Sequence, residues 1–194
     1  MIAAARMSWA AKHAELASAP KISNFLTTLL ASPTLPRWGQ WLEFGVASGG
    51  TLRQLAAARG EAKLFGFDSF RGLPQRWRDH RVGEYASEPP KVEGAELVVG
   101  LFEETLPHFT FGQVTLVHID CDLYSSAVSV LEAIRPHLVP GHAILTFDEL
   151  LDYPGHEEHE LRALGEAFEA GMRFDWIARG DGPFDKERAA ILVW

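Results

Sequence analysis

The chain has 194 residues, 47% of them hydrophobic and 23% charged, a composition typical of one soluble globular domain. Its 26 acidic residues outnumber its 18 Lys and Arg, and this negative balance argues against nucleic-acid and anionic-membrane partners. One cysteine, Cys121, excludes an intramolecular disulfide framework. No membrane-length apolar segment or leader pattern is visible, so we expect a cytoplasmic location.

The N-terminal region predicts helix. An Ala-rich stretch runs to about Ala17, and Pro20 is a helix-start signal before apolar residues at helical spacing up to Leu30. Two further prolines end this pattern. We therefore expect an N-terminal helical segment over residues 1–37, followed by the main body of a single domain over residues 38–194.

Beyond this segment, strands and helices alternate. Seven short apolar runs predict strands: Trp41–Val46, Lys63–Phe67, Glu96–Val99, Val114–Ile119, Ala143–Phe147, Phe174–Ala178 and Ala189–Trp194. Helical periodicity separates most of them, at Thr51–Ala58, Tyr124–His137 and Glu157–Ala170. This order predicts a doubly wound, Rossmann-like α/β sheet of about seven strands, mostly parallel, with helices on both faces. Residues 70–94 are polar and too long for a plain connection, so they are either functional or mobile.

Ligands of such sheets bind beyond the carboxyl ends of the strands, which directs attention to a glycine-rich turn after the first strand. Gly45, Ala47 and Gly50 match a relaxed dinucleotide fingerprint, although a plain strand–helix turn has the same residues. Glu43 precedes the glycines. Its carboxylate would oppose a pyrophosphate and would suit the ammonium group of an amino-acid-like ligand.

Asp68 ends the second predicted strand. A carboxylate at this place can accept two hydrogen bonds from ribose hydroxyls. Nicotinamide enzymes and S-adenosylmethionine enzymes both use this arrangement, so Asp68 predicts a nucleoside without naming the cofactor. The alternative is a strand-end aspartate that caps the next turn.

Four carboxylates follow two further strands, Asp120 and Asp122 after one and Asp148 and Glu149 after the other. If the strands are neighbours, these acids converge and repel one another, and a hard divalent cation such as Mg²⁺ would relieve that repulsion. The alternative is that Asp122 and Glu149 cap helices and point to solvent. His118 lies in the apolar run Val114–Ile119, just before Asp120, and is expected to be a core residue.

Taken together, these features resemble the class I S-adenosylmethionine-dependent methyltransferases and, more narrowly, the macrocin O-methyltransferase family. The resemblance covers roughly Trp38 to Phe168. It is carried by Glu43–Gly49, Phe67–Pro74, Gly100–Pro107, His118–Tyr124 and the run from Pro140-Gly141 to Asp148-Glu149. The chain departs from the family pattern at Glu149, where an Asp is usual, and at Cys121, which replaces a common Gly.

The resemblance implies S-adenosylmethionine as cofactor and a role for Mg²⁺. The residues it assigns to the cofactor are Glu43, Phe44, Gly45, Gly49, Asp68, Ser69, Phe70, Gly100 and Phe102. Of Asp120 and Asp122, it implies that one is a base and the other a metal ligand. We expect Asp120 to be the catalytic base and Asp122, Asp148 and Glu149 to hold the metal.

The function predicted is O-methylation of a sugar or other small-molecule natural product, by a protein that can form homo-oligomers and binds neither nucleic acid nor membrane. The alternatives are a nicotinamide-dependent oxidoreductase and a non-catalytic cofactor-binding module. Residues 156–160 resemble a zinc-protease motif, but the histidine spacing is wrong and a solvated helix start is expected. Four arginines between residues 71 and 81 either cover the cofactor, hold an anionic substrate group or lie on a solvated loop.

Overall fold

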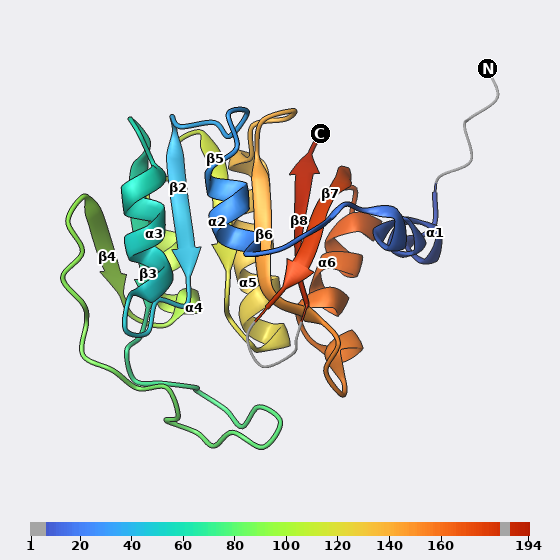
Figure 1. Cartoon of the computed structure of the whole chain (residues 1–194). Coiled ribbons are helices and arrows are strands. Elements are labelled where there is room, and N and C mark those ends of the chain that lie inside the picture. Colours follow the sequence, from blue (N-terminus) through green and yellow to red (C-terminus); the bar gives the residue numbers. More distant parts are fainter. Residues whose placement is uncertain (1–6, 183–186) are drawn as a thin grey trace.

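The computed structural model describes residues 7–182 and 187–194, which form one eight-stranded sheet flanked by helices (Figure 1). The strand order is β1-β7-β8-β6-β5-β2-β3-β4. The strands are β1 (Lys21–Ile22), β2 (Gln40–Phe44), β3 (Lys63–Asp68), β4 (Ala95–Val99), β5 (Val114–Ile119), β6 (Ile144–Leu151), β7 (Phe174–Asp181) and β8 (Glu187–Val193).

All neighbouring strands are parallel except at β8, which is antiparallel to both β6 and β7. The chain order reverses between β2 and β5, and ligands of open α/β sheets bind beyond the carboxyl ends at such a switch point. The predicted mostly parallel, doubly wound sheet is confirmed, with one strand more than the seven expected.

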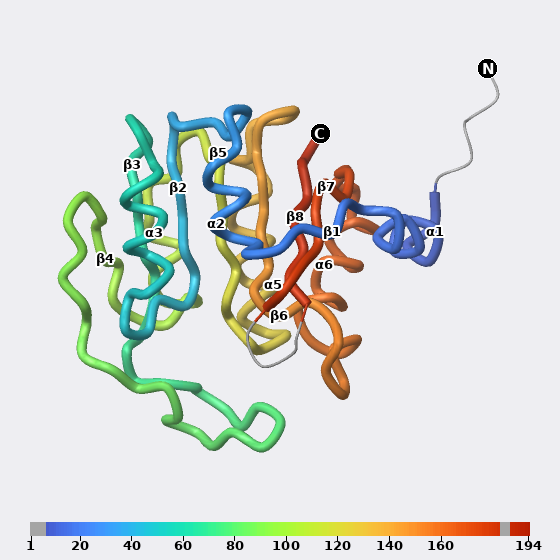
Figure 2. Tube along the Cα trace, viewed as in Figure 1, coloured from blue at the N-terminus to red at the C-terminus, as the bar shows by residue number. Residues whose placement is uncertain are grey.

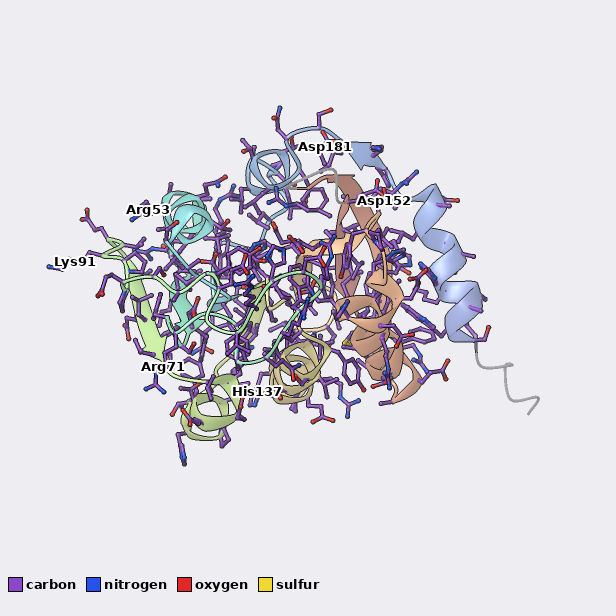
Figure 3. The ribbon with its side chains drawn as sticks, turned by 90° about the horizontal axis from the view of Figure 1, so that it is seen from below. Arg53, Arg71, Lys91, His137, Asp152 and Asp181 are labelled. Carbon is purple, nitrogen blue, oxygen red and sulfur yellow. The ribbon has the colours of Figure 1, made fainter. Side chains whose placement is uncertain are left out.

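Helices cover both faces of the sheet, as Figure 3 shows in a view from below. α2 and α3 lie on one face, and α4, α5 and α6 lie on the other. The helices are α1 (Trp9–Ala14), α2 (Phe25–Leu30), α3 (Gly50–Ala58), α4 (Phe102–Thr105), α5 (Tyr124–Ile134) and α6 (Glu160–Glu169). Short 3₁₀ turns lie at Glu15–Ser18, Leu106–His108, Arg135–His137 and His156–Glu158.

Two apolar cores result, because successive strand residues point to opposite faces. Trp41 packs with α2 and α3, whereas Leu42 and Phe44 pack with α5 and α6. The continuous apolar runs of the central strands reflect this burial on both sides. Within the described residues, no helix is long and apolar enough to cross a membrane.

The N-terminal segment differs from the prediction of helix throughout. Its first six residues lie outside the described part of the chain, and Lys21–Ile22 form strand β1 beside β7. Pro20 therefore precedes a strand, and its carbonyl accepts the N–H of Arg179 at 2.9 Å. Gly180 permits this pairing, because a Cβ there would overlap the carbonyl oxygen of Ile22. Sheet pairing thus overrides the local helical spacing.

The segment between β3 and β4 crosses beneath the carboxyl ends of the strands, as the tube trace shows (Figure 2). Its backbone folds on itself, since Leu73 N–H donates to Glu84 O and Gly83 N–H donates to Leu73 O, both at 2.9 Å. Trp77 is 1% exposed and packs with Leu73, Leu123 and Tyr153 in a small third core. The segment is therefore an ordered wall below the carboxyl ends of the strands.

Candidate functional site

The glycine-rich turn after β2 brings backbone close to backbone. Gly45 has φ +92°, and a Cβ at this position would overlap the carbonyl oxygen of Asp120. The Gly45 N–H donates to Phe67 O at 3.0 Å, and the Asp120 N–H donates to Phe44 O at 2.9 Å. Gly45 thus lets the ends of β2, β3 and β5 meet at one place, where the turn leads into α3.

Asp68 ties this turn to the end of β3. Its Oδ2 accepts the N–H groups of Val46 and Ala47, and its Oδ1 accepts the N–H of Phe70, all at 2.8 Å. Asp68 therefore caps this turn, the role that the sequence analysis gave as the alternative to binding a ribose. Because a carboxylate has about four acceptor sites, Asp68 retains the capacity to accept one further hydrogen bond.

A cavity of about 270 Å³ opens at this edge of the sheet. The lining residues come from the glycine turn, the ends of β3, β4, β5 and β6, and the segment below them. Nine of these lining residues were predicted from the sequence to bind the cofactor, to hold the metal or to accept the proton: Gly45, Asp68, Ser69, Gly100, Phe102, Asp120, Asp122, Asp148 and Glu149. The topology therefore gathers most of the predicted site residues around one space.

Four residues predicted to bind the cofactor do not line the cavity. Phe44 packs on Phe67 and Phe102, with ring centroids 4.7 and 5.6 Å apart. Gly49 precedes α3 with φ +79°, and Phe70 is buried with φ +57°. These three shape the backbone around the cavity.

Glu43 is the fourth, a buried carboxylate beneath the glycine turn. It is 1% exposed, and its Oε2 has no hydrogen-bond partner among the described residues. Burial raises its pKa well above the ordinary value, and the nearby carboxylates of Asp148 and Asp68 add to this effect. An acceptor buried at such a cost suits a cationic or hydrogen-bond-donating ligand group.

Asp120 is the most crowded acid of the site. Burial raises its pKa well above the ordinary value, and Asp148, Asp122, Glu160 and Glu149 raise it further through their negative charges. A carboxyl group in this environment holds a proton more tightly than one in water, which is the property of a proton acceptor.

Asp148 has a cationic partner that the sequence analysis did not identify. Arg188 on β8 donates from Nε to Asp148 Oδ1 at 2.6 Å, and its Nη2 contacts the same oxygen. The pair forms because Phe147 lies opposite Ala189 in the antiparallel β6–β8 register. Arg188 offsets part of the negative charge, and a cation at Asp148 would have to share the carboxylate with it.

His118 is a second residue near the site to which the sequence analysis gave no functional role. It is 2% exposed, and burial lowers its pKa to about 4, so the ring is neutral. Thr146 Oγ1 lies 2.8 Å from His118 Nδ1 and 3.3 Å from the carbonyl oxygen of Val117, and its single proton can serve only one of the two. Nε2 has no hydrogen-bond partner among the described residues and lies 3.8 Å from Asp148 Oδ1. It can act as a metal ligand in the tautomer that carries the ring proton on Nδ1.

These contacts test whether the site suits a metal ion. Ligand atoms of His118, Asp120 and Asp148 all lie within 4.8 Å of one another, as a metal site requires. In the described part of the chain, the predicted trio of Asp122, Asp148 and Glu149 forms no such group. Asp148 belongs to both groups, and the one whose ligand atoms lie close together includes an imidazole nitrogen, a donor that suits transition metals better than Mg²⁺.

Glu160, the first residue of α6, was also missed. It is 1% exposed, and its Oε1 accepts the Cys121 N–H at 3.1 Å. The turn that it holds is tight: Asp122 has φ +60°, and the Leu123 N–H donates to Cys121 O at 2.5 Å. Glu160 thereby fixes the backbone that presents Asp120 and Asp122.

Comparison with known proteins agrees with this geometry. Residues 42–150, more than half of the chain, match the model of a methyltransferase domain family. A curated relative from Streptomyces olivaceus is 27% identical over 151 residues, 64% of this chain. It is described as 8-demethyl-8-(2,3-dimethoxy-alpha-L-rhamnosyl)-tetracenomycin-C 4'-O-methyltransferase, and the match spans 58% of its length.

Two solved structures share the fold. CalS11, described as a TDP-rhamnose 3'-O-methyltransferase of calicheamicin biosynthesis, is 25% identical with a TM-score of 0.59, over 94% of this chain and 80% of that one. The O-methyltransferase NovP has a TM-score of 0.62 at 17% identity, over 86% and 76% of the two chains. The resemblance inferred from the sequence is confirmed: this chain belongs to the methyltransferase domain family, among the class I S-adenosylmethionine-dependent methyltransferases.

Proposed function

We propose that this protein transfers the methyl group of S-adenosylmethionine to a hydroxyl oxygen of a sugar in a small natural product. The observation that carries the proposal is the convergence of Asp120, Asp122, Asp148 and Glu149 on the cavity that the glycine turn borders. Both similar proteins with a described substrate act on rhamnosyl hydroxyls, which supports a sugar acceptor.

The residues of the cavity fit this cofactor. Gly45 lets the backbones at the ends of β2 and β5 meet beside the cavity, and Asp68 has one acceptor site left for a ribose hydroxyl. Glu43, which does not line the cavity, has a buried acceptor near the end of β2. Ser69, Gly100 and Phe102 would border the adenine. The cofactor supplies a methyl group activated by its sulfonium charge.

Asp120 is the proposed proton acceptor. Transfer forms a C–O bond and breaks a C–S bond, and the proton of the acceptor hydroxyl must leave. A carboxylate with a raised pKa takes that proton more readily than an exposed one, once the positive charge of the bound ligand has favoured its ionised form. The protein otherwise acts by alignment, which can contribute about 7–11 kcal/mol to lowering the barrier.

A divalent cation is part of the proposal. Asp148 would hold it, together with Asp122 and Glu149 as the resemblance implies or with Asp120 and His118 as their spacing favours. Such an ion would supply Lewis acidity that lowers the pKa of a bound hydroxyl.

Calorimetric titration tests the cofactor. S-adenosylhomocysteine and NAD are each added to the purified chain, with and without Mg²⁺. We expect S-adenosylhomocysteine to bind and NAD not to bind. Binding of NAD alone would favour the oxidoreductase alternative, and binding of neither would contradict both enzyme functions.

Methyl transfer is then measured by mass spectrometry with S-adenosylmethionine and rhamnose-bearing acceptors. The expected product is heavier by one methylene group. If the cofactor binds but no acceptor is methylated, the non-catalytic binding module becomes the better description.

A further inference from the structure

The ladder between β6 and β8 is irregular beside the candidate site. Its register shifts after the pair of Phe147 with Ala189. Beyond that pair, residues 148–150 of β6 lie opposite Arg188 alone on β8. Such a β-bulge redirects side chains and is common next to active sites. Because β8 lies next to β6 in the sheet (Figure 1), the bulge brings the guanidinium of Arg188 against the carboxylate of Asp148.

Arg188 holds one oxygen of Asp148 with two nitrogens. Its Nε donates to Asp148 Oδ1 at 2.6 Å, and its Nη2 contacts the same oxygen. A carboxylate oxygen has about two acceptor sites, so the two nitrogens of Arg188 take both sites of Oδ1. The side chain of Asp148 is 7% exposed and that of Arg188 is 22% exposed, so water and salt screen this pair only weakly. Arg188 is therefore the counter-ion of Asp148 in this structure.

The same oxygen faces the donors that a metal ion would use. Asp148 Oδ1 lies 3.8 Å from His118 Nε2, a buried nitrogen without a hydrogen-bond partner among the described residues. Ligand atoms of these two residues and of Asp120 lie within 4.8 Å of one another. A divalent cation at this place and the guanidinium of Arg188 would therefore use the same carboxylate, and their like charges repel.

Arg188 reaches Asp148 from outside the cavity. Asp148 is among the residues that line the cavity, whereas Arg188 is not. A long charged side chain can turn its charged end toward water while its stem stays packed. Because Arg188 is the more exposed member of the pair, a movement of its side chain is enough to release Asp148.

We propose that Arg188 competes with a divalent cation for Asp148 and thereby sets the metal affinity of the site. The inference rests on the cation included in the proposed function and assigns the residue that controls its binding. Arg188 keeps Asp148 paired in the absence of an ion, so metal binding exchanges one cation for another. The ion consequently binds more weakly than it would to the same ligands without the arginine.

The opposite role would be that Arg188 only orients Asp148 for the ion, as outer-shell partners of metal ligands commonly do. The two roles predict opposite effects of removing the arginine. Loss of a competing charge strengthens metal binding, whereas loss of an orienting partner weakens it by about 10–100-fold. The weak screening of the buried pair favours competition, because the repulsion between Arg188 and an ion is then large.

Calorimetric titration with Mn²⁺, in the presence of S-adenosylhomocysteine, distinguishes the two roles. Arg188→Met and Arg188→Gln remove the charge, and we expect the dissociation constant for Mn²⁺ to fall about tenfold or more in both. Arg188→Lys keeps the charge and should bind Mn²⁺ about as weakly as the wild type. Unchanged or weaker binding in the neutral variants would overturn the proposal. Binding by Arg188→Lys as tight as that of the neutral variants would also overturn it, because the charge would then not be the cause.

Thermal denaturation gives a second measurement on the same proteins. Without added cation, Arg188→Met leaves the buried Asp148 without its counter-ion and should melt at a lower temperature than the wild type. Mn²⁺ should then raise the melting temperature more in this variant than in the wild type. An equal or smaller rise would contradict the competition.

The matched control is Arg173→Met, at the opposite end of the sheet from the cavity. Arg173 is partly buried and donates to the carbonyls of Phe168 and Met172 at 2.9 and 2.8 Å. Its replacement removes one positive charge and should lower stability without changing the affinity for Mn²⁺. Tighter Mn²⁺ binding in this control would show that affinity follows the net charge of the protein, against the proposal.

Failure of the inference and failure of the proposed function give different results. If Mn²⁺ binds the wild type and the neutral variants equally, the inference is wrong and the cation keeps its place in the proposed function. If Mn²⁺ binds none of these proteins, both the inference and the cation are removed, and methyl transfer is still decided by the mass of the product. If Arg188 controls Mn²⁺ affinity as expected but no acceptor is methylated, the inference holds and the proposed function fails.

Discussion

The buried carboxylate of Glu160 accepts a hydrogen bond from the backbone N–H of Cys121, at 3.1 Å. This bond joins the start of α6 to the turn after β5. Cys121 lies between the two acids of that turn and lines the cavity, so a residue outside the cavity controls the geometry inside it.

Replacing Glu160 should loosen this turn, and the only cysteine of the chain reports on it. Cys121 is nearly buried, and burial raises the pKa of its thiol, so alkylation of the folded wild type by iodoacetamide should be slow. Glu160→Leu removes the acceptor of the Cys121 N–H, and we expect faster alkylation, measured by mass spectrometry. Glu160→Gln keeps a carbonyl acceptor and should alkylate at the wild-type rate. Equal rates in all three proteins would contradict the positioning role.

The wild type and the Glu160→Gln variant should also differ in how their stability depends on pH. Burial raises the pKa of Glu160 above its ordinary value of 4.5, so the folded protein holds this proton more tightly than the unfolded chain. The stability contributed by the group is greatest below pH 4.5 and falls as the pH rises toward the folded-state pKa. Glu160→Gln has no such loss. The melting temperature of the variant minus that of the wild type should therefore increase as the pH rises above 4.5. A constant or decreasing difference would disagree with a buried, protonated Glu160.

Gly45 should tolerate no side chain. Gly45→Ala places a Cβ against the carbonyl of Asp120 at a backbone φ of +92°, where strain alone costs about 1–3 kcal/mol. We expect a lower melting temperature and weaker binding of S-adenosylhomocysteine. The control is Gly50→Ala at the start of α3, where an added Cβ meets nothing within 4 Å and alanine favours the helix. Wild-type stability and affinity in Gly45→Ala would mean that the turn adapts more than its contacts indicate.

Asp68 has a structural role in the turn and a predicted role in binding the cofactor. The substitution Asp68→Asn separates these two roles. Asp68→Asn has one acceptor oxygen and an NH₂ group, so it cannot accept from Val46, Ala47 and Phe70 as both carboxylate oxygens do. Leaving such donors without a partner costs about 1–3 kcal/mol, and we expect a loss of stability in the absence of cofactor. Urea denaturation with and without S-adenosylhomocysteine measures both effects. If only the affinity for the cofactor falls, the three hydrogen bonds from the backbone N–H groups contribute little to the stability of the fold.

The sequence predicts the parts of the fold that depend on local pattern. Apolar runs mark the central strands because both faces of the sheet are covered, and the acids after β5 lie near those of β6 because parallel strands end at one edge. Strand β6 runs to Leu151, so Asp148 and Glu149 lie within it and not after it, as the predicted end at Phe147 implied. The strand β1 is not predictable in this way. Its two residues pair with β7 through backbone atoms, and Gly180 permits that approach from a distant part of the chain.

The missed site residues depend on tertiary packing. Glu160 follows a run of acidic residues typical of a solvated helix start, and only the docking of α6 buries it against Cys121. Arg188 meets Asp148 because β8 runs antiparallel to β6, an orientation that no apolar pattern encodes. His118 was correctly predicted to be buried. Its Nδ1 contacts Thr146 on the neighbouring strand and its Nε2 has no hydrogen-bond partner among the described residues, and both facts depend on how the strands pair.

Metal binding should be measurable through stability, because a cation that binds only the folded state raises the melting temperature. We expect Mg²⁺ or Mn²⁺ to stabilise the wild type, with Mn²⁺ the more effective if the imidazole of His118 takes part. Asp148→Asn should abolish the shift, since this residue belongs to both candidate ligand sets. Asp79→Asn, an exposed aspartate of the segment below the sheet, should keep it. His118→Phe then distinguishes the sets: loss of the Mn²⁺ preference would support a nitrogen ligand, and an unchanged preference would favour the carboxylates alone. If neither cation shifts the wild type in the presence of S-adenosylhomocysteine, Arg188 is the only cation that Asp148 requires, and the metal-assisted part of the proposal is wrong.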